Sequence, residues 1–146
     1  MIYAKCIRGS QIVKSKEEFL KRQNSGENHV YCKGEETVSK NGEAILCCAP
    51  LNCIFQCLKY GNYIAIIENE ELDYSQKYSA GAILARDSIA TKKQTVVEIL
   101  DPHNIEVIDF ILNEVGDSSK IMMGHASEEN IGAKAYQYLK SKLHQM

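Results

Sequence analysis

Six cysteines are the residues of this 146-residue chain that most readily suggest chemistry, and five of them fall between positions 32 and 57. Cys53 and Cys57 are four residues apart, so on a helix both thiols face the same side. Zinc takes four tetrahedral Cys or His ligands, usually in pairs separated by two to four residues, and this pair meets that spacing. Cys47 and Cys48 do not, because adjacent residues on a strand point to opposite faces.

Burial is the other use of such a cluster, because free cysteine is among the most buried residue types and packs as a small hydrophobe. We therefore expect packed thiols and no bound metal, with a zinc-stabilised structural module as an alternative. The cluster consists of Cys32, Cys47, Cys48, Cys53 and Cys57.

Nucleophilic catalysis is a second interpretation of this region. Cys48 and Cys53 lie near the start of a predicted helix, whose N-terminus lowers the pKa of a thiol. His103 and His125 are candidate partners, because the members of a Cys–His pair meet in space and not in sequence.

Two strand-ending glutamates suggest a further enzymatic alternative. Glu68 and Glu98 each end an apolar run, as in small α+β domains that use such a glutamate for ADP-ribosyl transfer. A polar residue usually stands two positions before that glutamate, but Ile66 and Val96 occupy those positions here. The sequence therefore leans against an enzyme.

Basic residues give the preferred ligand-binding prediction. The stretch 86–93 places three cations between two predicted strands, where a guanidinium binds phosphate oxygens in pairs and an ammonium acts as a point charge. Arg8 lies beside a turn, and His103 follows Asp101 at a predicted helix start, where anions are attracted. The alternative is a solvated loop and a simple helix cap. The predicted ligand-binding residues are Arg8, Arg86, Lys92, Lys93 and His103.

Composition and absent motifs exclude several classes. A formal net charge of −2 disfavours a nucleic-acid binder. The chain has no GxxxxGK[ST], GxGxxG, HExxH or GxSxG motif, which disfavours P-loop, dinucleotide-binding, metalloprotease and α/β-hydrolase functions. No apolar run is long enough to span a membrane, and the first residues do not resemble a signal peptide, so we expect a cytoplasmic protein.

Hydrophobic periodicity predicts a single α+β domain over residues 1–146, with a mostly antiparallel sheet and about four helices. Asn41-Gly42 between strand-like runs predicts a hairpin over 37–46. The other predicted strands cover residues 2–7, 11–13, 29–32, 63–67, 81–85, 94–100 and 120–123.

Capping residues and apolar stripes locate the helices. Ser15 predicts a helix that ends near residues 24–26 and has Phe19 and Leu20 inward. Pro50 predicts a helix that ends at Gly61. Asp101-Pro102 predicts one that ends at Gly116, and Ser127 predicts a last helix over 128–144. The expected core stripes are Leu51, Ile54, Phe55 and Leu58; Ile105, Ile108, Leu112 and Val115; and Ile131, Ala135, Tyr138 and Leu139.

Two stretches, LCCAPLN (46–52) and YGNYIAIIE (60–68), resemble a motif of a small uncharacterised domain found in phage and prophage proteins. In that family a Gly-Phe-His-Ala-Cys turn leads into a Pro-Leu-Asp helix, followed by a strand ending in Val-Glu. Here Leu46-Cys47 stands in place of Gly-Phe-His, so no chemistry of that histidine is implied. The resemblance implies an accessory protein of a mobile element.

These observations predict a non-enzymatic accessory protein that sequesters or inhibits a host factor. The expected partner is a host defence protein or a nucleotide-like signal, and no cofactor is expected. Small accessory domains gain interface area by self-association, so a homo-oligomer is expected. The alternatives are a small nucleotide- or protein-modifying enzyme and the zinc-stabilised module.

Overall fold

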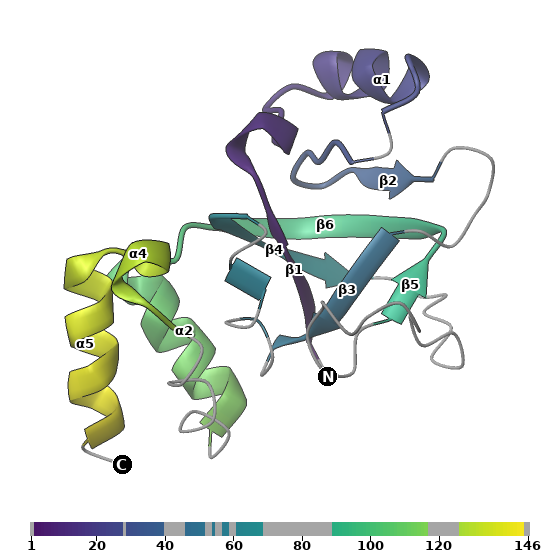
Figure 1. Cartoon of the computed structure of the whole chain (residues 1–146). Coiled ribbons are helices and arrows are strands. Elements are labelled where there is room, and N and C mark those ends of the chain that lie inside the picture. Colours follow the sequence, from purple (N-terminus) through teal and green to yellow (C-terminus); the bar gives the residue numbers. More distant parts are fainter. Residues whose placement is uncertain are drawn as a thin grey trace.

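The computed structural model describes residues 2–27, 29–39, 46–51, 54, 57, 58, 61–68, 89–116 and 126–144 (Figure 1). Its strands are β1 (Tyr3–Ile7), β2 (Glu36–Val38), β3 (Leu46–Pro50), β4 (Tyr63–Glu68), β5 (Ile89–Thr91) and β6 (Lys93–Leu100). Its helices are the 3₁₀ turn η1 (Gly9–Gln11) and α1 (Lys16–Asn24), α2 (Ile105–Val115), α4 (Glu128–Ile131) and α5 (Ala133–His144). The predicted α+β class with an antiparallel sheet is confirmed. None of the helices in these ranges is long and apolar enough to cross a membrane.

The sheet is curled, because the continuous β5–β6 segment contributes strands near both of its edges. Hydrogen-bonded neighbours follow the order β2-β6-β4-β1-β3-β5, and every pair is antiparallel. β5 is therefore at one edge and β6 is next to the other edge, yet only Lys92 separates them in the chain. The β5–β6 segment pairs with β3 at its start and with β4 further along, so the sheet encloses an inner face (Figure 1).

Successive side chains along the strands point alternately to the inner and outer faces of the sheet, so the core has two parts. On β1, Tyr3 and Ile7 pack on the inner face, whereas Ala4 and Cys6 pack with the helices on the outer face. This is the period of two that a strand imposes on its side chains. The inner cluster consists of Tyr3, Ile7, Tyr31, Cys48, Ala65, Ile67, Ile89 and Val96.

A β-bulge changes this alternation on β6. Ile66 lies opposite Glu98, and the register shifts at the next pair, so Val97 is the extra residue on β6. Val96 packs in the inner cluster before the bulge, and Ile99 packs against it after the bulge. The bulge therefore turns Ile99 onto the inner face at the end of the sheet.

Helices α2 and α5 lie side by side and cover the outer face. Their buried side chains pack with Ala4, Ala49 and Ile64 of the sheet. The stripe predicted for α2 is rotated: Ile108 is fully buried, but Leu112 and Val115 are only partly buried. The helical residues buried in this cluster are Val107, Ile108, Ile111, Ile131, Ala135, Leu139 and Leu143.

Two predicted helices differ from the structure, because a turn precedes one and a glycine interrupts the other. The backbone carbonyl of Asp101 accepts a hydrogen bond from the backbone amide of Asn104 in a turn, and α2 begins only at Ile105. Ser127 caps α4 as expected, but Gly132, at φ +84°, ends it and separates α4 from α5. The predicted helix over 128–144 is therefore two helices.

Other predicted strands are only partly described. β2 pairs with β6, and β3 pairs with β1 and β5, whereas residues 40–45 of the hairpin predicted over 37–46 lie outside the described residues. Residues 29–32 contribute one bridge, from Tyr31 to Ile12, and residues 9–11 form η1 before it. The turn at Asn41-Gly42 and the strands predicted at 81–85 and 120–123 lie outside the described residues.

Local predictions hold where the signal is strong. Ser15 accepts a hydrogen bond from the amide of Glu18 at the start of α1, and Phe19 is buried, although Leu20 is exposed. After β3, the described residues Leu51, Ile54, Cys57 and Leu58 have 3₁₀ and not α-helical conformation, which differs from the predicted α-helix. Leu51, Ile54 and Leu58 are buried there as predicted, and Phe55 lies outside the described residues.

Candidate functional site

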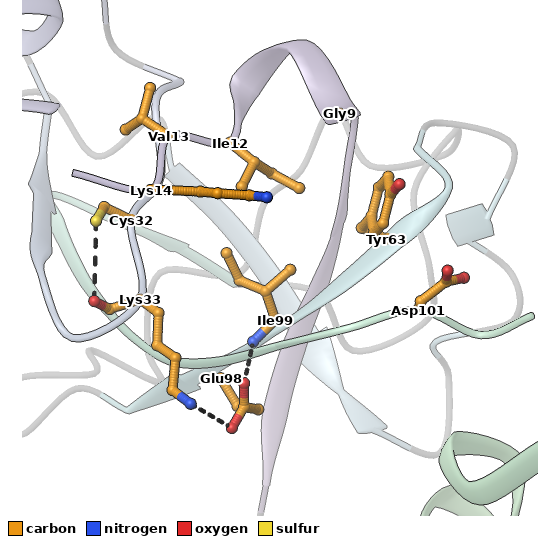
Figure 2. A pocket seen from close by; sticks show the side chains of 10 residues that line it. All are labelled: Gly9, Ile12, Val13, Lys14, Cys32, Lys33, Tyr63, Glu98, Ile99 and Asp101. Carbon is orange, nitrogen blue, oxygen red and sulfur yellow. Dashed lines mark hydrogen bonds and ion pairs between the residues drawn. The ribbon is translucent and has the colours of Figure 1, made fainter. Parts of the chain in front are cut away.

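A pocket of about 500 Å³ opens at the end of the sheet where β1, β4 and η1 meet (Figure 2). This volume is within the range of small-molecule sites. Four segments supply its lining: η1 with the residues after it, the residues after Tyr31, the start of β4 and the end of β6. The lining residues are Gly9, Ile12, Val13, Lys14, Cys32, Lys33, Tyr63, Glu98, Ile99 and Asp101.

The apolar part of the pocket is the open end of the inner cluster. Ile12, Tyr63 and Ile99 are partly buried, pack against that cluster and line the pocket. Ile99 reaches this position because of the bulge at Val97. Apolar side chains that stay partly exposed in a concave site favour the burial of an apolar ligand surface.

One side of the pocket carries an ion pair. The ammonium of Lys33 lies 2.9 Å from Oε2 of Glu98, and Oε1 of Glu98 accepts a hydrogen bond from the amide of Ile99 at 3.1 Å (Figure 2). The hydrogen bond from Lys33 holds the pKa of Glu98 below its ordinary value, and the amide of Ile99 adds to this effect. Glu98 is therefore ionised at neutral pH.

Lys14 is the unpaired cation of the lining. Its exposed side chain extends across the pocket in Figure 2, and its ammonium has no ion-pair or hydrogen-bond partner within the described part of the chain. An ammonium that ends over an apolar surface is available to an anionic group of a ligand.

Asp101 lies at the other end of the pocket, beside His103. Oδ1 of Asp101 accepts hydrogen bonds from the backbone amide of His103 at 3.0 Å and from its Nδ1 at 2.8 Å. Gly132 lies against the other side of this ring, where a Cβ would be 3.0 Å from Cδ2 of His103. The imidazole is thus held between two segments, while Oδ2 of Asp101 accepts no hydrogen bond from the described residues.

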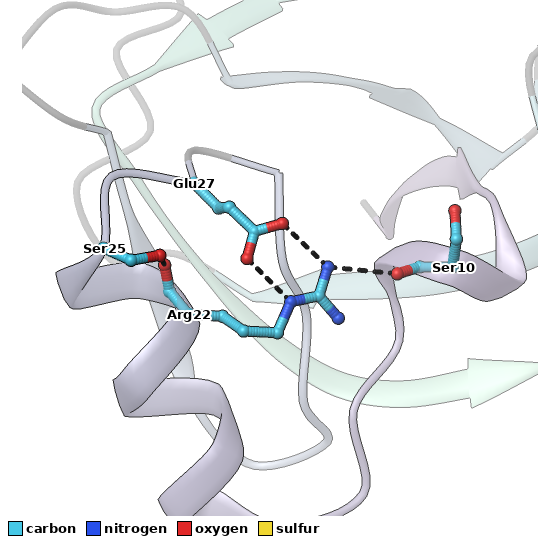
Figure 3. Close-up of polar contacts among 4 residues, drawn as sticks. All are labelled: Ser10, Arg22, Ser25 and Glu27. Atoms are coloured by element: carbon cyan, nitrogen blue, oxygen red, sulfur yellow. Dashed lines mark hydrogen bonds and ion pairs between the residues drawn. The ribbon is translucent and has the colours of Figure 1, made fainter.

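The η1 wall of the pocket is tied to α1. The guanidinium of Arg22 binds both carboxylate oxygens of Glu27, at 2.7 and 2.9 Å, and donates to the carbonyl of Ser10 at 3.1 Å (Figure 3). Ser25 donates its hydroxyl to the carbonyl of Arg22 at 2.7 Å. These contacts fix η1, and with it Gly9 at the pocket wall.

A polar network occupies the inner face between the strands. Lys5 on β1 donates to Oη of Tyr31 at 2.6 Å and to Oε1 of Gln94 at 3.0 Å, and Nε2 of Gln94 donates to the carbonyl of Leu46 at 3.1 Å. Nδ1 of His29 lies 3.2 Å from Oη of Tyr31. The network joins β1, β3 and β6 across the interior of the curled sheet. None of these residues lines the pocket.

The cysteines are packed where the structure describes them. Burial raises the pKa of Cys48 to about 12, and it also raises the pKa of Cys6, Cys32 and Cys47. These thiols are therefore protonated at neutral pH and are weak nucleophiles. Within the described ranges no group of three or more His, Cys, Asp or Glu residues has the arrangement to hold a metal ion. Cys53 and His125 lie outside those ranges.

The residues predicted to bind a ligand fall at two ends of the molecule. Arg8 precedes Gly9, and His103 follows Asp101, so both border the pocket without lining it. Lys92 and Lys93 lie at the opposite end of β6, roughly 20–25 Å away at about 3.3 Å per residue. Arg86 lies outside the described residues. Ligand binding by these five residues stays a prediction.

Sequence reasoning missed the cations that do line the pocket. Lys14 and Lys33 each stand alone among mixed neighbours, and no spacing or motif distinguishes them from other surface lysines. The sequence singled out Asp101, but as a helix cap and not as part of a cavity.

Comparison of the chain with protein-family models, with curated proteins and with solved structures gives no match.

Proposed function

We propose that the protein is a non-enzymatic binding protein that sequesters a small anionic molecule with an apolar body. The observation that carries this proposal is the ammonium of Lys14, which has no partner among the described residues and lies over the apolar floor of a pocket of about 500 Å³. The charge of such a lining orients a ligand. Its partly exposed apolar side chains add binding free energy when the ligand buries them.

The side chains around the pocket support binding over turnover. Cys32 lines the pocket, but burial raises the pKa of its thiol. His103 is oriented by Asp101, yet no hydroxyl or thiol within the described residues is hydrogen-bonded to its ring. Glu98 is ionised and paired with Lys33. A nucleophile paired with a base is the arrangement that acyl or glycosyl transfer needs, and these contacts do not form one.

The biological part of the proposal rests on the resemblance to phage and prophage domains. A mobile-element accessory protein with a ligand pocket would act by lowering the free concentration of a host molecule. The pocket supports a small signal molecule as that target over a host defence protein, because its size and lining suit a compound and not a protein surface. The expected homo-oligomer would raise the number of sites per particle.

A thermal-shift experiment on the full chain tests the proposal. Benzoate, glycerol phosphate, adenosine monophosphate and cytidine monophosphate are added singly. A ligand present at 100 times its Kd stabilises the folded state by about 2.7 kcal/mol. For a chain of this length that is a rise in Tm of roughly 5–10 °C. The proposal fails if none of these anions raises the Tm.

Gly9→Met provides the steric control. A Cβ at Gly9 would lie 3.5 Å from Cε2 of Tyr63, and Gly9 does not have a positive φ, so a side chain is tolerated there and extends toward the pocket. We expect Gly9→Met to abolish the ligand-induced shift. Ser10→Met, on the next residue of η1 and outside the lining, should retain it.

A further inference from the structure

The charges of the pocket are separated along its length. Glu98 with Lys33 lies on one side, and Asp101 lies three residues further along the extended chain, about 10 Å away. Figure 2 shows Tyr63 and Asp101 well apart from Cys32, Lys33 and Glu98. A ligand that fills this pocket therefore meets the Lys33–Glu98 ion pair at one end and the Asp101 carboxylate at the other, with the Lys14 ammonium beside Ile12 (Figure 2).

The ammonium of Lys14 suits a phosphate, because it has no partner among the described residues, whereas the ammonium of Lys33 is paired with Glu98. A phosphate monoester carries close to two negative charges at neutral pH and accepts several charge-assisted hydrogen bonds. It can therefore bind Lys14 more strongly than a lone carboxylate ligand does.

The middle of the pocket suits a flat ring. Tyr63 offers an aromatic surface, and the partly buried Ile12 and Ile99 line the same cavity. Aromatic side chains stack on nucleobases, and the interaction tolerates any base because each has a π-face. This part of the site therefore supplies affinity without choosing among bases.

Asp101 provides the selectivity among bases. Its Oδ1 is occupied by His103, and its Oδ2 remains as an acceptor. An ionised carboxylate accepts hydrogen bonds and donates none. It therefore favours a base edge that carries an amino group and repels one that carries a carbonyl oxygen at the same position.

We propose that the pocket binds a nucleoside monophosphate with an amino-bearing base, its phosphate on Lys14 and its amino group on Asp101. This inference rests on the proposed function and specifies the ligand class of the same site. The order of groups follows from the positions of Lys14 and Asp101 in the pocket, which lie apart in Figure 2.

Two matched ligand pairs test the inference by calorimetric titration of the full chain. Cytidine and uridine monophosphate differ at position 4, which is amino in one and carbonyl in the other, and at N3, which accepts a hydrogen bond in cytidine and donates one in uridine. Adenosine and inosine monophosphate differ in the same way at position 6 and N1. We expect the amino member of at least one pair to bind roughly ten- to a hundredfold more tightly, the loss typical of an unmatched polar group. Equal affinities within both pairs would overturn the inference.

Two substitutions assign the ends of the ligand. Asp101→Asn presents an amide that donates as well as accepts, so it should shrink or reverse the preference within the pair while His103 keeps an acceptor. Lys14→Gln should weaken binding of the monophosphate by roughly tenfold and leave the parent nucleoside unchanged. An equal loss for both compounds would contradict a phosphate at Lys14.

The outcomes separate this inference from the proposed function. Binding of benzoate or glycerol phosphate that Gly9→Met abolishes, with no binding of any nucleotide, would overturn the nucleotide assignment and leave the proposed function standing. No binding of any probe would overturn both. Nucleotide binding that is insensitive to Gly9→Met would place the nucleotide elsewhere and overturn the inference.

Discussion

Replacing Gln94 by leucine tests the polar network inside the curled sheet. Gln94 is fully buried, accepts a hydrogen bond from the ammonium of Lys5 at 3.0 Å and donates one to the carbonyl of Leu46 at 3.1 Å. Leucine has a similar volume, so the substitution removes two hydrogen bonds and leaves little cavity. It leaves the Lys5 ammonium with Tyr31 as its one oxygen acceptor among the described contacts.

The two lost hydrogen bonds set the expected magnitude. A hydrogen bond to a charged group contributes about 1.5–3 kcal/mol, and a neutral one contributes about 0.5–1.5 kcal/mol. The carbonyl of Leu46 keeps a second donor, the hydroxyl of Thr91 at 3.3 Å, so its share is at the low end. We expect Gln94→Leu to lower the free energy of unfolding by about 2–4 kcal/mol, which is a fall in Tm of roughly 5–15 °C.

Chemical denaturation of Gln94→Leu, Lys5→Met and the double variant measures this coupling. Removing both partners leaves no unsatisfied group between them, so the double variant should lose much less than the sum of the single losses. Gln137→Leu makes the same chemical change at an exposed position of α5 and should stay within about 0.5 kcal/mol of the unmodified chain. Strict additivity of the two single losses would refute the network as described.

Two further predictions concern stability. Gly132→Ala should lower the free energy of unfolding, measured by denaturation, by about 1–3 kcal/mol, because Gly132 has φ +84° and a Cβ there would crowd His103. Gly34→Ala is the control, because Gly34 has φ +86° with open space around it. It isolates the backbone cost and should lower the free energy of unfolding by less. Burial, then Lys5 and Arg8, hold the pKa of His29 below its ordinary 6.5, so the unfolded chain binds more protons there than the folded one. This contribution to stability is complete above pH 6.5 and is lost as pH falls through the folded pKa. His29→Gln should therefore flatten the decline in Tm measured between pH 7.5 and 5.5, and an unchanged slope would contradict this assignment.

Local signals were enough for some elements of the fold. Ser15 with the turn that follows predicts α1 because the capping hydrogen bond is made within three residues. The apolar run that becomes β4 is buried on both faces, so its sequence shows the strand without alternation. Gly116 ends α2 as predicted, with φ +53°. In each case the decisive interaction lies within a few residues or depends on composition alone.

Other elements depended on distant partners, which local patterns do not encode. The strand at 36–38 has turn-forming residues after it, but its hydrogen-bond partner is β6, more than fifty residues away. Asp101 and Pro102 have the types that start a helix, yet the turn they form comes first and the helix starts at Ile105. Leu20 has an apolar side chain, but the face of α1 that packs is the one that carries Phe19.

The candidate site was the least predictable feature, because no single segment contains it. Lys14, Lys33 and Asp101 come from three parts of the chain and meet only when the sheet curls. Ile99 faces the pocket because of the bulge at Val97, and a one-residue shift of this kind reverses the face expected from alternation.

The two ends of the curled sheet are chemically different, and this difference makes the stability and binding predictions separable. Gln94 lies four residues before Glu98, the nearest lining residue on β6, roughly 13 Å along the strand, and its hydrogen-bond partners Lys5 and Leu46 do not line the pocket. Effects at sites further apart than about 10 Å usually add without coupling. Gln94→Leu should therefore lower the Tm of the free protein and leave the nucleotide Kd unchanged, whereas Gly9→Met should do the reverse. If Gln94→Leu weakened binding in proportion to its loss of stability, the inner network and the pocket would form one cooperative unit, and the pocket could not be treated as a preformed site.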